Sequence, residues 1–199
     1  MVCTRTFSDL SVIDKLEYDE KSDMKKLRVA SFFAGIGGFD LGFEAVGFEV
    51  NFQCEIHRFC GTLLKHRWPG VTFDKDISIT EPDSIPDADI WCGGFPCQDL
   101  SVARGSLGRH GLNGSRSGLF FQFAALAEKK KPSLILIENV QGLLNSNDGK
   151  DFAELLHTLG SLRYAISWRL LNSRYFGVPQ SRPRVYIWGL IRDRPRLLS

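Results

Sequence analysis

The stretch from Ser133 to Ile137 limits most strongly what this chain can fold into. It reads Ser-Leu-Ile-Leu-Ile, and this apolar run is typical of a central parallel strand that other elements cover on both faces. Parallel strands need long crossover connections, most often helices. Strand-like and helix-like patterns alternate along the rest of the chain, with no internal repeat. The sequence therefore predicts an α/β fold with one doubly wound, mostly parallel sheet.

The other elements follow from short apolar runs and from apolar residues at helical spacing. We expect strands at residues 27–33, 48–54, 71–73, 88–92, 164–171 and 185–191, and helices at residues 39–46, 58–68, 117–131 and 151–162. Residues 1–26 are polar and mixed in charge, and we expect an N-terminal arm there. Residues 27–199 are long enough for one core, so we expect a single domain.

A glycine turn separates the first expected strand from its helix. It reads Ala34-Gly35-Ile36-Gly37-Gly38, and such a turn lets backbone N–H groups approach a ligand closely. Glu55 follows 20 residues after Gly35, at the end of the second expected strand. An acid at this position binds the ribose hydroxyls in nucleoside-binding α/β folds. This turn is shorter than the full glycine pattern of dinucleotide-binding folds. A nucleoside cofactor smaller than a dinucleotide is therefore favoured.

Cys97 stands directly after a turn that ends another expected strand. Gly93 and Gly94 end that strand, and Pro96 fixes the backbone just before the cysteine. A lone cysteine can also be a small buried apolar residue, so this position alone leaves its role open. The Gly-, Ser- and Arg-rich stretch from Gln98 to Arg116 has no periodicity. Its length predicts a mobile loop next to the cysteine.

Glu138 and Asn139 follow the central strand, at the edge of the sheet where ligands bind in open α/β folds. Burial beside apolar residues favours a protonated carboxyl, so Glu138 is a candidate to hold or donate a proton near neutral pH. A carboxylate that caps a turn is the alternative. The same choice applies to Asp76, which can receive an exocyclic amine or cap its own turn.

Arg182 and Arg184 lie two apart in an extended segment, so both project to one side. Pro183 between them implies an edge or bulge position. From Leu155 to the C-terminus the sequence holds eight arginines, no lysine and one acid, Asp193. Guanidinium groups bind phosphates and carboxylates bidentately, so this distribution suits such contacts. A solvated surface is the alternative for the pair.

The composition excludes several classes of protein. The net charge of +2 is too small to argue for nucleic acid by itself. No apolar run approaches the ~18 residues of a membrane span, and no signal-peptide core is present. The five cysteines include no CxxC pair, and Cys54, His57 and Cys60 lack a second ligand pair, so we expect no metal site. This pattern fits a reduced, cytoplasmic compartment.

Four motifs then occur in a fixed order. They are Phe33-Ala34-Gly35-Ile36-Gly37-Gly38, Gly94-Phe95-Pro96-Cys97-Gln98, Glu138-Asn139-Val140 and Gln180-Ser181-Arg182-Pro183-Arg184. Together they resemble the DNA (cytosine-5) methyltransferase family over about residues 27 to 191. The resemblance implies a Rossmann-like methyltransferase fold, with S-adenosylmethionine as cofactor and S-adenosylhomocysteine as product.

The resemblance also implies a set of site residues. The implied cofactor-binding residues are Phe33, Gly35, Ile36, Gly37, Gly38, Glu55, Ile56, Asp76, Ile77 and Leu119. The implied catalytic residues are Cys97, Glu138, Arg182 and Arg184, and the implied DNA-binding residues are Pro96, Gln98, Ser101, Asn139 and Gln180. Within the cofactor set, Glu55 would contact the ribose, and Asp76 with Ile77 would contact adenine.

In the implied reaction, the thiolate of Cys97 attacks carbon 6 of a cytosine that is flipped out of double-stranded DNA. Carbon 5 then takes the methyl group. Glu138 would contact ring nitrogen 3 and the exocyclic amine, Arg184 the carbonyl oxygen, and Arg182 a phosphate or the catalytic loop. The Gln98–Arg116 loop would close behind the base.

One departure from the family concerns target recognition. Family members continue after the last matched strand into a target-recognition region and a final cofactor motif, whereas this sequence ends at Ser199. We therefore expect the catalytic chain of a split prokaryotic or phage enzyme, with a second polypeptide as partner. The alternatives are a truncated or non-catalytic chain, and an RNA cytosine-5 methyltransferase.

Overall fold

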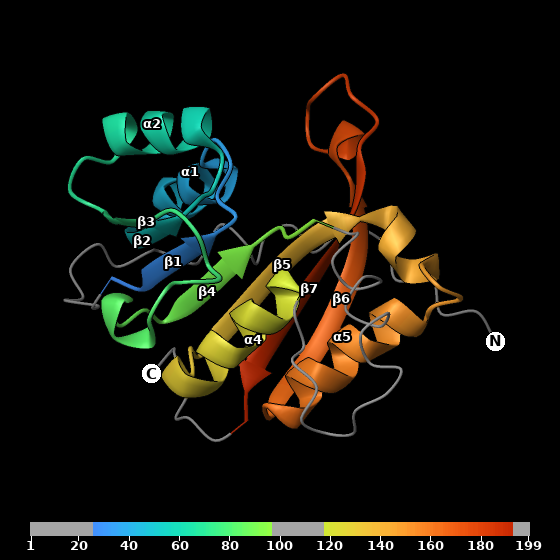
Figure 1. The fold of residues 1–199 in the computed structure, drawn as a ribbon. Helices are drawn as coiled ribbons and strands as arrows, with labels where there is room; N and C mark the ends of the chain where they lie inside the picture. The colour runs from blue at the N-terminus through green and yellow to red at the C-terminus, as the bar shows by residue number, and fades with distance from the viewer. Residues whose placement is uncertain (1–25, 97–117, 193–199) are drawn as a thin grey trace, which may run out of the picture.

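A seven-stranded sheet organises the residues that the computed structural model describes, which are 26–96 and 118–192 (Figure 1). The strand order is β3-β2-β1-β4-β5-β7-β6. The strands are β1 Arg28–Phe32, β2 Glu49–Cys54, β3 Thr72–Asp74, β4 Ile90–Gly93, β5 Leu134–Val140, β6 Tyr164–Asn172 and β7 Pro183–Ile191. β1 to β5 pair in parallel, and β7 runs antiparallel to both β5 and β6. The predicted doubly wound, mostly parallel α/β fold is confirmed.

Helices fill the connections between the strands. The α-helices are α1 Gly38–Ala45, α2 Arg58–Arg67, α4 Leu119–Lys130 and α5 Lys150–Ser161, and the short 3₁₀ helices are η2 Pro82–Ser84, η3 Gln141–Asn145 and η4 Ser173–Tyr175. Each predicted strand and helix is present, with ends that differ by a few residues. Among the described residues, no helix is long and apolar enough to cross a bilayer.

The ends of two strands differ from the sequence prediction in a way that matters for the site. β5 continues through Glu138 and Asn139 to Val140, because β7 pairs with it as far as Arg184. β7 is an interior strand along most of its length, whereas Pro183, for which the sequence predicted an edge or bulge position, pairs on one side only. Pro183 is the first residue of β7 and lies beyond the end of β5, with only β6 beside it, where a missing N–H breaks no ladder bond.

The two faces of the sheet carry separate apolar clusters. Alternate residues of β1 show the division, since Ala30 and Phe32 belong to one cluster and Val29 to the other. The first cluster includes buried residues of α4 and α5, which lie in front of the sheet in Figure 1. The second includes Phe39 and Phe43 of α1. The chain therefore changes faces between β1 and β4, and open α/β sheets bind ligands at the carboxyl ends of the strands beside such a switch point.

Gly37 at the start of α1 is required by its neighbour as well as by its backbone. Its φ is +87°, in the left-handed region that favours glycine. A Cβ there would lie 2.5 Å from Cη2 of Trp68. Trp68 is buried and is the residue directly after the end of α2. Trp68 is held in place because its indole N–H donates to Glu44 of α1, at 2.6 Å. The glycine turn and the end of α2 are therefore packed directly on each other.

Replacing Gly37 by alanine is expected to destabilise the fold, by about 1–3 kcal/mol, because a strained backbone and a steric clash with Trp68 act together. Gly42 is the matched control, since it lies inside α1 and an added Cβ would meet nothing within 4 Å. Gly42→Ala is expected to stabilise the protein by about 0.5–1 kcal/mol. Urea unfolding followed by circular dichroism measures both changes. Equal effects of the two substitutions would contradict this account of Gly37.

Candidate cofactor and catalytic site

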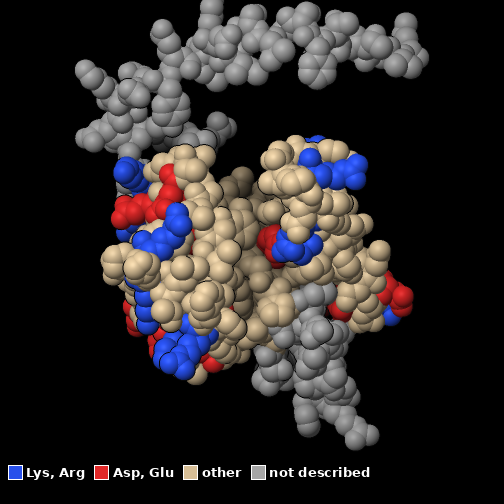
Figure 2. All heavy atoms as spheres, turned by 90° about the horizontal axis from the view of Figure 1, so that it is seen from above, with Lys and Arg blue, Asp and Glu red and all other residues tan. Residues whose placement is uncertain are grey.

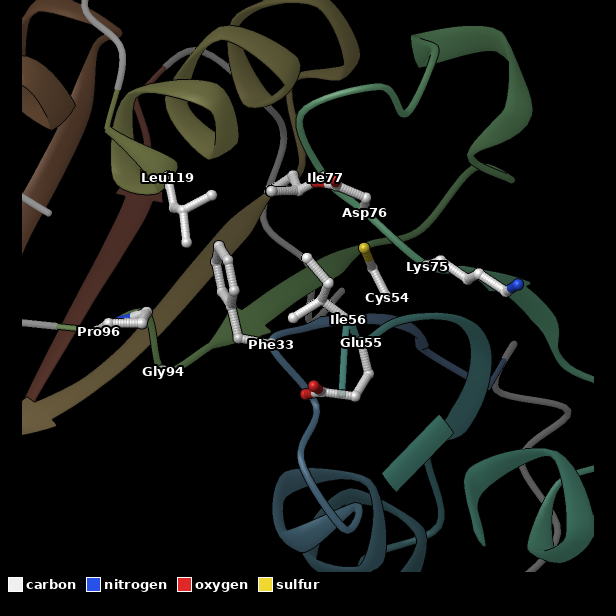
Figure 3. Close-up of a pocket in the computed structure, with 10 residues that line it drawn as sticks. All are labelled: Phe33, Cys54, Glu55, Ile56, Lys75, Asp76, Ile77, Gly94, Pro96 and Leu119. Atoms are coloured by element: carbon white, nitrogen blue, oxygen red, sulfur yellow. The ribbon is translucent and has the colours of Figure 1, made fainter. Parts of the chain in front are cut away.

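A cavity of about 200 Å³ opens at the carboxyl ends of β1, β2 and β4 (Figure 3). Its lining residues are Phe33, Cys54, Glu55, Ile56, Lys75, Asp76, Ile77, Gly94, Pro96 and Leu119. Figure 2 shows the same end of the molecule from above, and the surface there is hollowed between two raised parts. The structure therefore brings together six of the ten predicted cofactor residues, which are Phe33, Glu55, Ile56, Asp76, Ile77 and Leu119.

Glu55 is oriented by backbone N–H groups on both of its oxygens. Its Oε2 accepts a hydrogen bond from the N–H of Gly35 at 2.7 Å, and its Oε1 accepts one from the N–H of His57, also at 2.7 Å. The N–H of Ala34 donates to the carbonyl of Cys54 at 3.2 Å. The glycine turn is thus tied to the end of β2, and the Glu55 carboxylate is held at the cavity with lone pairs to spare for a hydroxyl donor.

Apolar side chains form much of the remaining wall. Phe33 has a φ of +52°, an uncommon conformation for a bulky residue, and its ring points into the cavity in Figure 3. Ile77 is buried, and Leu119 begins α4. Cys54 adds a neutral thiol, because burial raises its pKa to about 12. Such walls suit a flat aromatic ring.

Asp76 combines the two roles that the sequence left open. Its Oδ1 accepts a hydrogen bond from the N–H of Ser78 at 2.9 Å, so it caps its own turn. It also lines the cavity, and its proposed contact with an exocyclic amine stays a prediction. The four remaining predicted cofactor residues, Gly35, Ile36, Gly37 and Gly38, are not among the cavity-lining residues.

An ion pair lies beside the cavity, on the neighbouring strands β5 and β7. Arg184 Nε is 2.8 Å from Glu138 Oε1, and both side chains are about one-fifth exposed. Gly94, which lines the cavity, lies against the same carboxylate, since a Cβ on it would be 3.0 Å from Glu138 Oε2. The sequence predicted roles for both charged residues but not this pair, because it depends on the antiparallel register of β5 and β7.

Tyr186 is a residue that sequence reasoning missed. It is the register partner of Glu138 on β7. Burial raises the pKa of its hydroxyl, and the negative charge of Glu138 raises it further, while Arg182 and Arg184 oppose the shift. Tyr186 therefore stays neutral near Glu138. No motif or spacing in the sequence singles it out.

Asn139 is buried and fixes the chain that leads toward Cys97. Its Nδ2 donates to the carbonyl of Phe95 at 2.9 Å, and its Oδ1 accepts from the N–H of Val140 at 2.8 Å. The ring of Phe95 packs on Phe120, with centroids 5.2 Å apart. The end of β4 is thus joined to the end of β5. A contact of Asn139 with DNA stays a prediction.

The remaining predicted residues divide into two groups. Cys97, Gln98, Ser101 and the expected loop 98–116 lie outside the described residues. Gln180 and Arg182 are exposed in the segment between η4 and β7. Asn172 Oδ1 accepts a hydrogen bond from the N–H of Arg182 at 3.0 Å, and Ser173 Oγ donates to the carbonyl of Gln180 at 2.6 Å. Their roles as DNA contacts stay predictions.

The described residues hold no group of three or more His, Cys, Asp or Glu side chains that is arranged to bind a metal ion. Cys54 is the last residue of β2 and is buried. Cys60 lies on α2 and is half-buried. The Cys54, His57 and Cys60 spacing therefore does not produce a metal cluster in this part of the chain.

Comparison with known proteins identifies the class to which this arrangement belongs. The sequence profile of the C-5 cytosine-specific DNA methylases matches residues 27–197, and the chain belongs to this family. Type II methyltransferase M2.BsuMI of Bacillus subtilis is 38% identical over 174 residues, which cover 85% of this chain and 43% of that protein. Type II methyltransferase M.HaeII of Haemophilus aegyptius is 38% identical over 168 residues, or 84% and 52%. The chain thus spans about half the length of these relatives.

Solved structures show the same fold. The Schizosaccharomyces pombe Dnmt2 methyltransferase superposes with a TM-score of 0.63 at 21% identity, over 86% of this chain and 52% of that one. A Spodoptera frugiperda DNMT2 variant gives a TM-score of 0.66 at 22% identity, over 84% and 51%. At this level of identity the likeness concerns the fold alone.

S-adenosylmethionine is the cofactor of this family, and the cavity fits its adenosyl part. The Glu55 carboxylate can accept ribose hydroxyls, and Phe33, Ile77 and Leu119 offer apolar contact to a base. Gly35 leaves open space where any other residue would place a Cβ. Contacts of these residues with the cofactor stay predictions.

Glu55→Gln is expected to weaken binding of S-adenosylhomocysteine about tenfold. The reason is that a neutral amide replaces the charged carboxylate that would accept hydrogen bonds from the ribose hydroxyls. Glu49→Gln is the matched control, since Glu49 is exposed at the other end of the same strand. Isothermal titration calorimetry measures both affinities. Unchanged affinity in Glu55→Gln would contradict the assignment of Glu55 to the ribose.

Proposed function

We propose that this chain forms the catalytic part of an enzyme that transfers a methyl group from S-adenosylmethionine to carbon 5 of cytosine in double-stranded DNA. One observation supports this most directly. The Glu138–Arg184 pair lies against Gly94, which lines the cofactor cavity and stands three residues before Cys97. Glu138, the cavity and the chain that leads toward Cys97 as far as Pro96 therefore meet at one edge of the sheet.

Cys97 is the proposed nucleophile. Carbon 5 of cytosine is too weak a nucleophile to take a methyl group while the ring is aromatic. The Cys97 thiolate would form a bond to carbon 6, which breaks the double bond between carbons 5 and 6 and leaves carbon 5 electron-rich. After methylation, loss of the proton from carbon 5 restores that double bond and expels the sulfur.

Glu138 and Arg184 would bind the pyrimidine edge during this attack. The Glu138 carboxyl would contact ring nitrogen 3 and the exocyclic amine and supply a proton to nitrogen 3, where charge develops as sulfur bonds to carbon 6. The Arg184 guanidinium would contact the carbonyl oxygen at carbon 2. The 2.8 Å distance between the two side chains supports a contact of both with one edge of the base.

When bound, the cofactor supplies an electrophilic methyl group on a positively charged sulfur. Glu55 would orient it through the ribose, and Phe33 and Ile77 would hold its base. Pro96 lines the same cavity and is the last described residue before Cys97, so cofactor and nucleophile would face the base together.

Base flipping is part of the proposal. Carbon 6 of a stacked cytosine is out of reach of a thiol in a pocket, so the base would have to leave the duplex at a cost of about a few kcal/mol. Arg182, exposed beside the pair, is the proposed phosphate contact.

Target recognition is proposed to come from a second polypeptide. The chain spans 43% and 52% of the lengths of the two relatives described above, and phosphate contacts alone carry no sequence information. We propose that the partner provides the base contacts and completes the cofactor site. The relatives include bacterial type II methyltransferases and a phage orphan methyltransferase. These relatives support a prokaryotic or phage setting, in which the cysteines would be reduced. The proposed role there is protection from restriction or regulation.

Covalent trapping tests the proposed function. With DNA that contains 5-fluorocytosine and with S-adenosylmethionine, the chain is expected to form a stable adduct in the presence of a complementary polypeptide, because fluorine replaces the proton that must leave. Cys97→Ser is expected to abolish the adduct, and Cys60→Ser is the control that keeps it. Denaturing gel electrophoresis detects the adduct. Adducts on RNA alone would move the substrate to RNA, and none under any condition would point to a non-catalytic chain.

Glu138→Gln is expected to slow adduct formation about 10²–10⁴-fold while leaving S-adenosylhomocysteine affinity unchanged, because the amide keeps the shape but cannot supply the proton. Glu128→Gln, at an exposed position of α4, is the matched control. Quenched time courses on the same DNA give the rates. A rate equal to that of the unmodified chain would remove Glu138 from the mechanism.

A further inference from the structure

A fully buried carboxylate lies behind the glycine turn, on the face of the sheet that α1 covers. Asp40, in the first turn of α1, has no exposed surface. Its Oδ1 accepts a hydrogen bond from Gln53 Nε2 at 2.7 Å, and its Oδ2 accepts one from Ser31 Oγ at 3.0 Å. Ser31 on β1 and Gln53 on β2 are register partners and are themselves buried. One carboxylate thus joins one helix to two strands.

This arrangement is unusual for the interior of an apolar layer. The apolar cluster on the face of the sheet that α1 covers includes valines of β1 and β2 and phenylalanines of α1. Burial raises the pKa of Asp40, and the hydrogen bonds from Gln53 and Ser31 partly offset that rise. Buried polar groups lose hydration, so three of them in one place need a reason beyond filling space. The proposed reaction uses none of the three.

The network lies close along the chain to the contact between the glycine turn and Glu55. Gln53 is two residues before Glu55 on β2, and Asp40 is five residues after Gly35. The segment from the glycine turn into α1 is therefore tied to the β2 segment at two levels. The outer level is the Gly35–Glu55 hydrogen bond at the cofactor cavity, and the inner level is the Asp40–Gln53 hydrogen bond in the core.

We propose that Asp40 is a positioning residue of the cofactor site, which holds the start of α1 on β1 and β2 so that the glycine turn stays in hydrogen-bonding distance of Glu55. Asp40 is not among the residues that line the cavity and acts through the turn. This inference rests on the assignment of that cavity to S-adenosylmethionine. A separate measurement on the cofactor-free chain keeps the two distinguishable.

Asp151 offers a matched control elsewhere in the fold. It is in the first turn of α5, is 1% exposed, and accepts hydrogen bonds from Ser146 Oγ at 2.6 Å and from Asn147 Nδ2 at 3.2 Å. None of these three residues lines the cofactor cavity. Asp151→Ala therefore removes the same kind of buried helix-start carboxylate without touching the glycine turn.

The test compares Asp40→Ala, Asp40→Asn and Asp151→Ala. Asp40→Ala is expected to weaken S-adenosylhomocysteine binding about tenfold, because a displaced turn loses its alignment with Glu55. Asp40→Asn is expected to bind as the unmodified chain does, since its oxygen can still accept from Gln53 and its amide can donate to Ser31. Asp151→Ala is expected to lose stability in urea but keep its affinity.

Hydrogen–deuterium exchange on the cofactor-free chain provides the second readout. Asp40→Ala is expected to speed exchange of the amides in residues 33–37, and Asp151→Ala to leave them unchanged. Unchanged exchange in Asp40→Ala, or equal loss of affinity in both alanine variants, would overturn the inference. An equal loss of affinity in Asp40→Asn and Asp40→Ala would also overturn it, because hydrogen bonding by residue 40 would then not explain the effect. No binding by the unmodified chain, even with a complementary polypeptide present, would instead overturn the cofactor assignment.

Discussion

Parallel pairing of β1 to β5 is the constraint on which the rest of the structure depends. Because these strands run in one direction, their carboxyl ends meet at one edge of the sheet. Phe33, Glu55 and Gly94 follow three different strands and yet line a single cavity. Residues that are up to about 60 positions apart in the chain become neighbours for this reason alone. The change of face between β1 and β4 then leaves this edge open to a ligand.

Antiparallel β7 adds the second part of the site. A parallel strand in its place would bring its own carboxyl end to this edge, whereas β7 brings its amino end. That reversal puts Arg184 beside Glu138, and it lets the exposed segment before β7 lie near the same edge. The cavity therefore lies at the parallel half of the sheet. The Glu138–Arg184 ion pair lies at the boundary between the parallel half and the antiparallel half.

The sequence predicted the elements well because their signals are local. The apolar run at Ser133–Ile137, the glycine turn and the alternation of patterns each depend on neighbouring residues, and all describe elements that the structure contains. Three features escaped prediction because they depend on distant partners. Trp68 against Gly37, Asn139 on Phe95 and the Glu138–Arg184 pair each require the register or packing of elements far apart in the chain.

The Glu138–Arg184 pair also affects how a base can enter. A partly buried carboxylate without a partner is costly, and the ion pair with Arg184 at 2.8 Å offsets that cost for Glu138. Under the proposed function, an incoming cytosine would offer a donor amine to Glu138 and an acceptor oxygen to Arg184, and would replace the ion pair with two hydrogen bonds of matching polarity. Thymine offers a carbonyl where cytosine has the amine, and it would leave the carboxylate facing a second acceptor. Under the proposed function, the Glu138–Arg184 pair would therefore favour cytosine over thymine.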